Sequence, residues 1–330
     1  MFQLKKFLVI QTAFIGDVIL STPIFSELKR IHPNAEIDVV VRAGNDTLLQ
    51  NNPHIHEIFS WNKKQNKYLS LFQTIKKIRR KSYDEVFTLQ RYHSASIMTF
   101  FALSKNKVGF DSARLKWVFN TTVSHSLKSG IHEVNRNLNL IGHYQPNLAA
   151  RPQLFPTNQD LEKIKSYQSK SYYCIAPASV WTTKQLPENQ WKKLINALPS
   201  ESNIYLLGSK SDSDLCERLI PLNSKIENLA GKLSILESAA LMKGAKMNYV
   251  NDSGPLHIAS AMNAPVRAFF CSTVASFGFG PLSDDSKIVE VREDLACRPC
   301  GIHGHMKCPK DHFKCGNDIN IQELVKEIPA

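Results

Sequence analysis

The stretch Lys246-Met-Asn-Tyr-Val-Asn-Asp-Ser-Gly-Pro-Leu-His-Ile-Ala-Ser-Ala-Met-Asn-Ala-Pro265 combines the signals of a buried strand, a tight turn and a helix start. Its apolar run 247–250 is typical of a short buried strand, and the Ala-rich pattern after the turn is typical of a helix. Asp252 or Ser253 suits the N-cap position, and Pro255 suits the first helical turn. A strand that leads directly into a helix leaves unpaired backbone N–H groups at one point, which attracts anions, phosphate above all.

Three residues of this turn support the prediction of an anion site. Gly254 lets a ligand approach the backbone closely, Ser253 offers a hydroxyl group, and His257 lies on the first turn of the helix. The alternative is an ordinary strand-to-helix turn in which Asp252 caps the helix and the histidine packs in the core. The turn alone does not separate these interpretations.

The composition is that of a globular chain long enough for two domains. Of its 330 residues, 43% are hydrophobic and 21% are charged. No apolar run approaches the ~20 residues that span a bilayer. Gln11 and Asp17 interrupt the apolar N-terminal stretch, which therefore predicts a first strand rather than a signal peptide. We expect a cytoplasmic protein, whose seven cysteines are thiols or metal ligands rather than disulfides.

Positive charge is concentrated in the first half of the chain. Up to Pro156 there are 21 Lys and Arg residues against 10 Asp and Glu residues, a net charge of +11, whereas the remainder carries +1. This asymmetry predicts that the first half meets an acidic partner, which is a nucleic acid, a membrane surface or an anionic substrate.

Strand and helix patterns alternate along the chain on both sides of a Pro-rich passage, 145–156. This passage is the predicted linker between domains 1–156 and 157–330. The alternation predicts two doubly wound α/β domains. The predicted strands are 7–12, 36–42, 84–89, 172–176, 203–207, 247–250 and 266–270, and the predicted helices include 17–30, 68–81 and 319–328.

In such domains, ligands bind at the carboxyl ends of the strands. In the first of these loops, Gly16 and Asp17 stand at a helix start. Neither the G-x-G-x-x-G fingerprint nor a P-loop is present, which weighs against NAD-dependent and P-loop chemistry. Asp17 is either a cap that complements the helix dipole, which chemistry alone favours, or a general base that faces the interdomain cleft.

A second loop, Ala176–Pro187, follows the first predicted strand of the second domain. Thr182, Thr183 and Lys184 offer two hydroxyl groups and one cation there, a set that suits a diphosphate. A solvated surface lysine is the alternative. Because this loop and the 251–257 turn lie at the same end of one predicted sheet, together they favour a diphosphate site more strongly than either does alone.

Four segments together resemble glycosyltransferase family 9, the bacterial heptosyltransferases that use ADP-heptose to build the inner core of lipopolysaccharide. They occur in the family's order and cover both halves of the chain. The resemblance implies a GT-B fold, in which two Rossmann-like domains face a central cleft and bind the acceptor and the nucleotide-sugar respectively. The segments are Ile15-Gly-Asp-Val-Ile-Leu-Ser-Thr-Pro23, Thr182-Thr-Lys-Gln-Leu-Pro187 with Trp191, Asn228-Leu-Ala-Gly-Lys-Leu-Ser-Ile-Leu236, and Asn251-Asp-Ser-Gly-Pro-Leu-His257.

The resemblance also implies roles for the matching residues. Asp17 is the base that deprotonates the acceptor hydroxyl, and the attack inverts the anomeric carbon as ADP leaves. No metal or other cofactor is required, because fixed donors stabilise the departing diphosphate. The residues that the resemblance assigns to the diphosphate site are Thr182, Thr183, Lys184, Asp252, Ser253, Gly254 and His257. For the nucleoside, the resemblance implies Leu233 in the adenine pocket and, after Gly208, an acidic residue on the ribose, which is Asp212 or its alternative Asp214. Further candidate acceptor contacts are Gly16, Arg91, His93 and Ser94, the last three of which follow a predicted strand.

A basic segment in the first half has two compatible interpretations. From Lys63 to Lys81 there are eight Lys or Arg residues and no acid, and Leu71, Phe72, Ile75 and Ile78 are predicted to share one helical face. Such a helix lies on an anionic membrane, or it packs its apolar stripe on the sheet and leaves a solvated basic face. The resemblance implies an anionic, lipid A-linked core oligosaccharide as acceptor, so we expect peripheral binding at the cytoplasmic face of the inner membrane.

Four cysteines near the C-terminus follow the spacing C-x2-C-x7-C-x6-C: Cys297, Cys300, Cys308 and Cys315. In a reducing compartment they predict a structural zinc site, with unliganded thiols as the alternative. A zinc-containing nucleic-acid-binding protein is a rival of another class, but the positive charge lies in the half without these cysteines, and we expect no nucleic-acid partner. The other rivals are a family member that transfers a different sugar to another cell-surface glycan and a non-catalytic sugar-nucleotide-binding protein.

Overall fold

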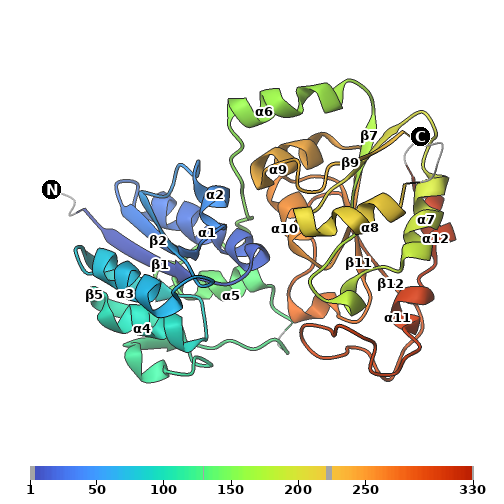
Figure 1. Ribbon diagram of the computed structural model, residues 1–330. Helices are drawn as coiled ribbons and strands as arrows, with labels where there is room; N and C mark the ends of the chain where they lie inside the picture. The colour runs from blue at the N-terminus through green and yellow to red at the C-terminus, as the bar shows by residue number, and fades with distance from the viewer. Residues whose placement is uncertain (1–3, 129, 221–224, 329–330) are drawn as a thin grey trace. The chain divides into compact units, whose positions relative to one another are not determined.

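The chain folds into two compact units, Met1–Phe155 and Pro156–Ala330, in a computed structural model that describes residues 4–128, 130–220 and 225–328. The predicted boundary lies one residue later. Each unit is built on one six-stranded sheet with helices on both faces (Figure 1). All strand pairs are parallel, so the doubly wound α/β architecture predicted from the alternation is confirmed in both units.

The N-terminal sheet has the strand order β3-β2-β1-β4-β5-β6. Its strands are β1 (Lys6–Gln11), β2 (Glu36–Arg42), β3 (Glu57–Trp61), β4 (Ser82–Thr88), β5 (Leu103–Phe110) and β6 (Thr121–Val123). Its helices are α1 (Ile15–Ile31), α2 (Asp46–Leu49), α3 (Lys67–Ile78), α4 (His93–Phe101) and α5 (Glu133–Asn139), with short 3-10 turns η1 (Lys116–Val118) and η2 (Gly142–Tyr144).

The C-terminal sheet repeats this pattern with the order β12-β11-β10-β7-β8-β9. Its strands are β7 (Tyr172–Ala176), β8 (Asn203–Leu206), β9 (Ile226–Asn228), β10 (Met247–Asn251), β11 (Val266–Phe270) and β12 (Ser286–Glu290). Its helices are α6 (Asn158–Ile164), α7 (Glu188–Ala197), α8 (Ser213–Arg218), α9 (Ile235–Gly244), α10 (Gly254–Ala261), α11 (Lys314–Asn317) and α12 (Ile321–Val325), with 3-10 turns η3 (Lys165–Gln168), η4 (Thr182–Lys184), η5 (Lys210–Asp212) and η6 (Ala275–Phe277).

In each sheet the first strand of the unit is central, and the chain builds outward from it first on one side and then on the other. Ligands of open parallel sheets bind at such a switch point, beyond the carboxyl ends of the two strands that flank it. In the N-terminal unit these ends belong to β1 and β4. In the C-terminal unit they belong to β7 and β10. The candidate loops of the sequence analysis, which follow β1, β7 and β10, therefore lie at the switch points of the two sheets.

Helix α3 packs its apolar stripe on the N-terminal sheet. Leu71, Ile75 and Ile78 are buried in one cluster with the strand residue Trp61, as predicted. Phe72, predicted on the same face, is instead 64% exposed. The prediction for Phe72 was wrong because positions i, i+4 and i+7 form the buried stripe, and its neighbour is turned by about 100° from it. Among the described residues, no helix is both long and apolar enough to cross a bilayer.

The Pro-rich passage predicted as a linker largely packs on the N-terminal unit. The Asn147 N–H donates to Glu27 Oε2 at 2.7 Å, and the Gln153 N–H donates to Thr22 Oγ1 at 3.0 Å, both on α1. Leu154 is buried. Prolines favour extended backbone without helix or sheet partners, but they do not require that the segment be free of the domain. The freely connecting segment is therefore shorter than the composition indicates.

Candidate active site

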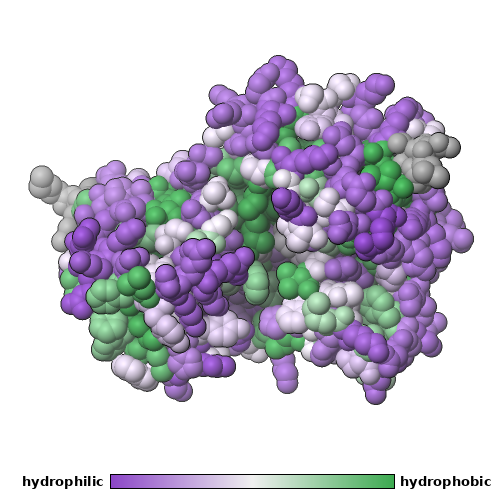
Figure 2. All heavy atoms as spheres, viewed as in Figure 1, coloured by the Kyte–Doolittle hydropathy of each residue, from purple (hydrophilic) through white to green (hydrophobic). Residues whose placement is uncertain are grey.

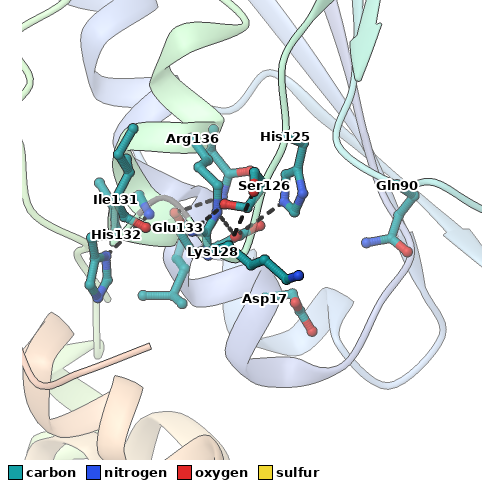
Figure 3. A network of polar contacts seen from close by, with 12 residues as sticks. Asp17, Gln90, His125, Ser126, Lys128, Ile131, His132, Glu133 and Arg136 are labelled. Atoms are coloured by element: carbon teal, nitrogen blue, oxygen red, sulfur yellow. Dashed lines mark hydrogen bonds and ion pairs between the residues drawn. The ribbon is translucent and has the colours of Figure 1, made fainter. Parts of the chain in front are cut away.

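Asp17 lies at the N-terminal switch point, on the first turn of α1, which follows β1 (Figure 3). The N-cap of this helix is Phe14, and its side chain makes no capping hydrogen bond. Asp17 is the third helical residue, so it is not the N-cap that chemistry alone favours. Negative charge in this turn still complements the helix dipole.

The surroundings of Asp17 favour its protonated form. Partial burial raises the pKa of Asp17 from 3.8 to about 6, and the negative charge of Glu133 acts in the same direction. Hydrogen bonds from the backbone of Asp17 and Phe14, and the positive charge of Arg91, act in the opposite direction. A carboxylate with a pKa near the working pH is well suited to accept a proton during a reaction.

A buried ionic network on α5 supplies the second carboxylate. Glu133 Oε2 accepts a hydrogen bond from Arg136 Nε at 2.7 Å and lies 3.4 Å from His125 Nε2 (Figure 3). Burial alone would raise the pKa of Glu133, but the hydrogen bonds and charges of these two partners outweigh it and lower the pKa. Glu133 is therefore ionised. The amide of Asn137 donates to the Leu20 carbonyl at 3.3 Å and ties α5 to α1.

Sequence analysis missed Glu133, His125 and Arg136. They lie more than 100 residues from Asp17 in the sequence, in a segment where no strand or motif was recognised. An acidic residue just after a helix N-cap also complements the helix dipole in many proteins, so it carries no signal of its own. Only the packing of α5 on α1 brings the carboxylate close to Asp17.

The other predicted acceptor residues lie at the same edge of the N-terminal sheet. Gly16 is in the first turn of α1, Arg91 is exposed beyond β4, and His93 and Ser94 begin α4. Of these, Arg91 acts electrostatically on Asp17. Gln11 and Gln90, at the carboxyl ends of β1 and β4, were not predicted as site residues, and their side chains join the two strand ends. Gln90 Nε2 donates to Gln11 Oε1 at 2.8 Å.

A basic pocket of about 480 Å³ opens beside the start of α1, at the carboxyl ends of β1, β2 and β3. Its described lining includes the cations Arg42, Lys63 and Lys64 and no acidic residue. The Arg42 guanidinium lies 5.8 Å from the centre of the Phe14 ring. The full lining is Phe14, Ile15, Arg42, Ala43, Gly44, Asn45, Asn62, Lys63, Lys64 and Gln65. Such a lining suits anionic groups of a ligand.

The C-terminal switch point holds a buried ion pair. Lys184 Nζ, on η4 after β7, lies 2.6 Å from Asp252 Oδ2, which follows β10, and the side chains are 15% and 8% exposed. The same carboxylate oxygen accepts a hydrogen bond from Thr273 Oγ1 at 2.6 Å. Asn251 joins the two loops, because its Oδ1 accepts from the Leu186 N–H at 2.9 Å. The two predicted phosphate loops therefore meet at one edge.

The two threonines beside Lys184 differ in their surroundings. Thr182 is exposed, whereas Thr183 is buried. The Thr183 hydroxyl donates to Ser272 Oγ at 3.1 Å and accepts from the His305 N–H at 2.8 Å. Both hydrogen bonds are made within the protein. The structure thus gives Thr183 a role in fixing the loop, which a sequence-based assignment to the diphosphate did not foresee.

The turn after β10 has the predicted local structure. Ser253 is the N-cap of α10, without a side-chain cap bond, and Pro255 lies in its first turn. Gly254 begins the helix, so its N–H lies at the helix start, whereas Pro255 has no N–H and the Leu256 N–H donates to the Ser253 carbonyl at 3.1 Å. His257 is buried, with its ring 6.4 Å from that of Phe279. The helix start, Ser253 and Lys184 together form a set of donors for a phosphate.

The predicted nucleoside residues lie at the end of β8, next to β7, and at the start of α9. Asp212 Oδ2 accepts from the Ser209 N–H and the Ser209 hydroxyl, each at 2.7 Å, and so caps its own turn. A Cβ on Gly208 would lie 2.9 Å from the Asp212 Cβ, which explains the glycine. Leu233 is half-buried just before α9. The structure brings Gly208 and Asp212 together, while Leu233 comes from a separate loop.

Within the described part of the chain, no three ligand atoms of the four C-terminal cysteines and their neighbours lie within 4.8 Å of one another. Cys297 Sγ lies 3.8 Å from His312 Nε2, and burial raises the pKa of Cys315 to about 11. The sulfurs of a tetrahedral zinc site lie about 3.8 Å from one another. Among the described residues, the one group of three candidate ligand atoms within 4.8 Å of one another is Asp38, His56 and Glu57. Zinc at the cysteines therefore stays a prediction.

That acidic group is already paired with a cation. Lys81 Nζ lies 2.8 Å from Asp38 and 2.5 Å from Glu57, and the Tyr83 hydroxyl donates to Asp38 at 2.9 Å. These residues lie on or beside β2, β3 and β4, toward the ends opposite to Asp17. The cluster is a network of ion pairs that joins strands, and it lies away from the switch point.

Two Rossmann-like units, each with one parallel six-stranded sheet between helices, have the architecture of the GT-B glycosyltransferases. The sequence profile of glycosyltransferase family 9 (heptosyltransferase) matches residues 71–309, and the chain belongs to this family. It is 25% identical to lipopolysaccharide heptosyltransferase 2 of Escherichia coli K12, over 98% of each chain.

Solved structures agree with this assignment of the fold. The E. coli ADP-heptose lipopolysaccharide heptosyltransferase II superposes with a TM-score of 0.81 at 21% identity, over 98% of this chain and 97% of that one. The E. coli heptosyltransferase WaaC, solved with ADP, superposes with a TM-score of 0.74 at 19% identity, over 98% of this chain and all of that one. The GT-B fold implied by the resemblance is confirmed. The protein is a heptosyltransferase of the lipopolysaccharide core family, which replaces the alternative of a nucleic-acid-binding protein.

Proposed function

We propose that the protein transfers heptose from ADP-heptose to the anionic, lipid A-linked inner core of lipopolysaccharide, with inversion at the anomeric carbon and without a metal. One observation carries the proposal: the switch points of the two sheets, which share one strand order, hold a carboxylate with a raised pKa in the first unit and a half-buried lysine beside a helix start in the second. Displacement of ADP by a hydroxyl group needs a proton acceptor and a stabilised leaving group. The related heptosyltransferase solved with ADP supports the nucleotide.

In this reaction Asp17 accepts the proton of the acceptor hydroxyl as its oxygen bonds to the anomeric carbon. The bond between that carbon and the β-phosphate oxygen breaks, and ADP leaves with the electron pair. Lys184, held by Asp252, and the backbone N–H groups at the start of α10 stabilise the new negative charge. Because the charge is met by fixed donors, the step needs no divalent ion.

The acceptor side of the proposal rests on charge. The pocket with Arg42, Lys63 and Lys64 suits phosphates and carboxylates of the lipopolysaccharide core. The pocket residues of the β2 and β3 ends are far from Asp17 in the sequence, but the sheet brings them close, since β2 lies beside β1 and β3 beside β2.

The N-terminal unit also presents a surface suited to the lipid part of the acceptor. Tyr68, Leu69 and Phe72 are exposed on α3, among its lysines. Helix α4, which packs beside α3, adds exposed Phe100 and Phe101. Figure 2 shows apolar residues exposed among hydrophilic ones on this part of the unit. Aromatic and basic side chains together favour the interface of an anionic bilayer, so we place the protein peripherally at the cytoplasmic face of the inner membrane.

The test is transfer in vitro. The protein is incubated with ADP-heptose and core lipopolysaccharide that lacks heptose, and the product is analysed by mass spectrometry and by NMR of the anomeric proton. We expect the mass of one heptose to be added, inverted configuration and an unchanged rate in EDTA. Transfer from another nucleotide-sugar with no transfer from ADP-heptose would replace the proposal by the alternative of a different sugar and glycan.

A further inference from the structure

The segment 291–313, between β12 and α11, contains no helix or strand, yet part of it packs on the C-terminal candidate site. Irregular segments of this length are uncommon within compact domains, and those that are ordered usually serve a function. Residues 298–305 make the contacts, and we call them the C-terminal strap.

The strap pairs with the donor loop through its backbone. The Thr183 N–H donates to the His305 carbonyl at 3.0 Å, and the His305 N–H donates to Thr183 Oγ1 at 2.8 Å. Gly304 approaches the loop so closely that a Cβ would lie 2.9 Å from Ser272 Oγ, 3.0 Å from Thr183 Oγ1 and 3.1 Å from Lys184 Cγ. Ser272 Oγ and Thr183 Oγ1 belong to short, buried side chains that cannot swing aside.

A second set of contacts joins the strap to the end of β11. Arg298 Nε donates to the Cys271 carbonyl and Arg298 Nη2 to the Thr273 carbonyl, both at 2.8 Å. The Cys300 N–H donates to the Ser272 carbonyl at 2.8 Å. Thr273 in turn donates to Asp252, the partner of Lys184. The strap is therefore linked to Lys184 in two ways. One runs through Thr183, its neighbour in the sequence, and the other through Thr273 and Asp252.

We propose that the C-terminal strap is a positioning element of the donor site, whose backbone fixes Thr183 and Lys184 in the geometry that binds the diphosphate. This inference rests on the proposed function, because it takes Lys184 to be a diphosphate ligand. The strap acts in this proposal through Thr183 and Lys184 and not as a ligand of the donor. Displacement of a positioned charge by about 1 Å is enough to lower a rate by up to about 10²-fold.

Two glycines of the strap give a matched pair of variants. Gly304 and Gly301 have φ values of +76° and +77°, so alanine carries a similar backbone cost at both. A Cβ at Gly301 meets nothing within 4 Å, whereas a Cβ at Gly304 meets the donor loop. Both variants carry the backbone strain of a positive φ, but only Gly304→Ala also disturbs the contact with the donor loop. The difference between them therefore measures the effect of that contact alone.

ADP affinity is measured by calorimetry for the wild type and both variants, with thermal unfolding as the test of folding. We expect Gly304→Ala to bind ADP about tenfold more weakly than Gly301→Ala, a difference of about 1.4 kcal/mol. Equal affinities in the two folded variants would overturn the inference. If the wild type itself does not bind ADP, the proposed function fails instead, so the two failures are distinguishable.

If Gly304→Ala does not fold, Thr183→Val and Thr183→Ser replace it. Valine keeps the shape and removes the hydroxyl that accepts from His305, whereas serine keeps the hydroxyl. We expect weaker ADP binding in the valine variant together with faster amide hydrogen exchange in the strap, residues 298–305, and neither change in the serine variant. Weaker binding with unchanged exchange would mean that Thr183 binds the nucleotide directly, and would overturn the role of the strap.

Discussion

The two units share one strand order, yet their switch points carry opposite chemistry. At the N-terminal point Asp17 lies near a second ionised carboxylate, Glu133, and its pKa is raised. At the C-terminal point the carboxylate of Asp252 is paired with Lys184 and hydrogen-bonded by Thr273. The fold determines where the site lies, and the loop residues determine whether it accepts a proton or binds an anion.

The same contrast extends to the net charge of the two halves. The N-terminal half carries almost the whole excess of positive charge, although its candidate catalytic group is acidic. In the C-terminal half positive and negative charges nearly balance, although its candidate site binds through a cation. The local chemistry of each candidate site is therefore separate from the net charge of its half, and only the positive N-terminal half would attract an anionic partner over a distance.

The largest effect is expected for Asp17→Asn, which removes the proton acceptor but keeps the shape. Single-turnover transfer at saturating substrates should fall by roughly 10²–10⁴, with ADP affinity unchanged. Because folding raises the pKa of Asp17 from 3.8 to about 6, the free energy of unfolding falls as the pH rises between these two values, and the full cost of ionising Asp17 in the folded state remains above pH 6. The variant should thus be at least as stable as the wild type at pH 7.5.

Asp46→Asn is the matched control, since Asp46 is also an acid in the first turn of a helix of the N-terminal unit. It should leave transfer unchanged. If the Asp17→Asn protein keeps more than about a tenth of the wild-type rate, which is far above the range for a lost base, Asp17 is not the general base. The N-terminal switch point would then have no proton acceptor to set against the anion site of the C-terminal one.

Lys184→Ala tests the C-terminal switch point, where we propose that the lysine binds the diphosphate. Loss of one charge-assisted contact in a partly buried site should weaken ADP binding by about 1.5–3 kcal/mol. The change also leaves the buried Asp252 without its cation, which destabilises the fold. The double variant Lys184→Ala/Asp252→Asn should recover thermal stability without recovering ADP affinity.

Lys193→Ala, an exposed lysine on α7, is the control and should bind ADP as the wild type does. If the double variant recovers affinity together with stability, Lys184 is a structural partner of Asp252 and not a ligand.

Helix α3 tests the charge asymmetry. Lys76→Ala/Lys77→Ala should weaken binding to vesicles that contain anionic lipid by about 1 kcal/mol for each lysine. The adjacent exposed lysines of α7 give the matched control Lys192→Ala/Lys193→Ala, which should bind as the wild type does. Sedimentation with vesicles measures both. Equal losses in the two variants would show that net charge, and not the α3 surface, governs the interaction.

The smallest effect on turnover is expected for Glu133→Gln. The negative charge of Glu133 raises the pKa of Asp17, so its removal should lower that pKa from about 6 and extend activity to more acidic pH. At high pH, where Asp17 is ionised in both proteins, turnover should stay near that of the wild type. A pH–rate profile with an unmoved acidic limb would show that Glu133 does not act on Asp17. Thermal unfolding is followed in parallel, because Arg136 loses its buried partner.

The sequence predicted the central strands well and the outer ones poorly. Strands β1, β2, β7, β10 and β11 are covered on both faces, so they appear as continuous apolar runs. The edge strands β3, β6, β9 and β12 went unrecognised, as did β5. They are short or partly exposed: β9 has three residues, and most of β12 is exposed or half-exposed. An edge strand is stabilised by its single neighbour, which the local sequence does not encode.

The sequence by itself determined the fold class and the two donor-side loops, because strand burial and helix starts are local properties. It placed Lys184 and the 251–257 turn at one sheet edge through topology alone. Tertiary structure decided what each group meets there: Glu133 near Asp17, Asp252 on Lys184, and the Thr183 hydroxyl on His305, 122 residues away in the chain. Such partners are set by how loops and helices pack over the sheet, and that packing depends on the whole folded chain.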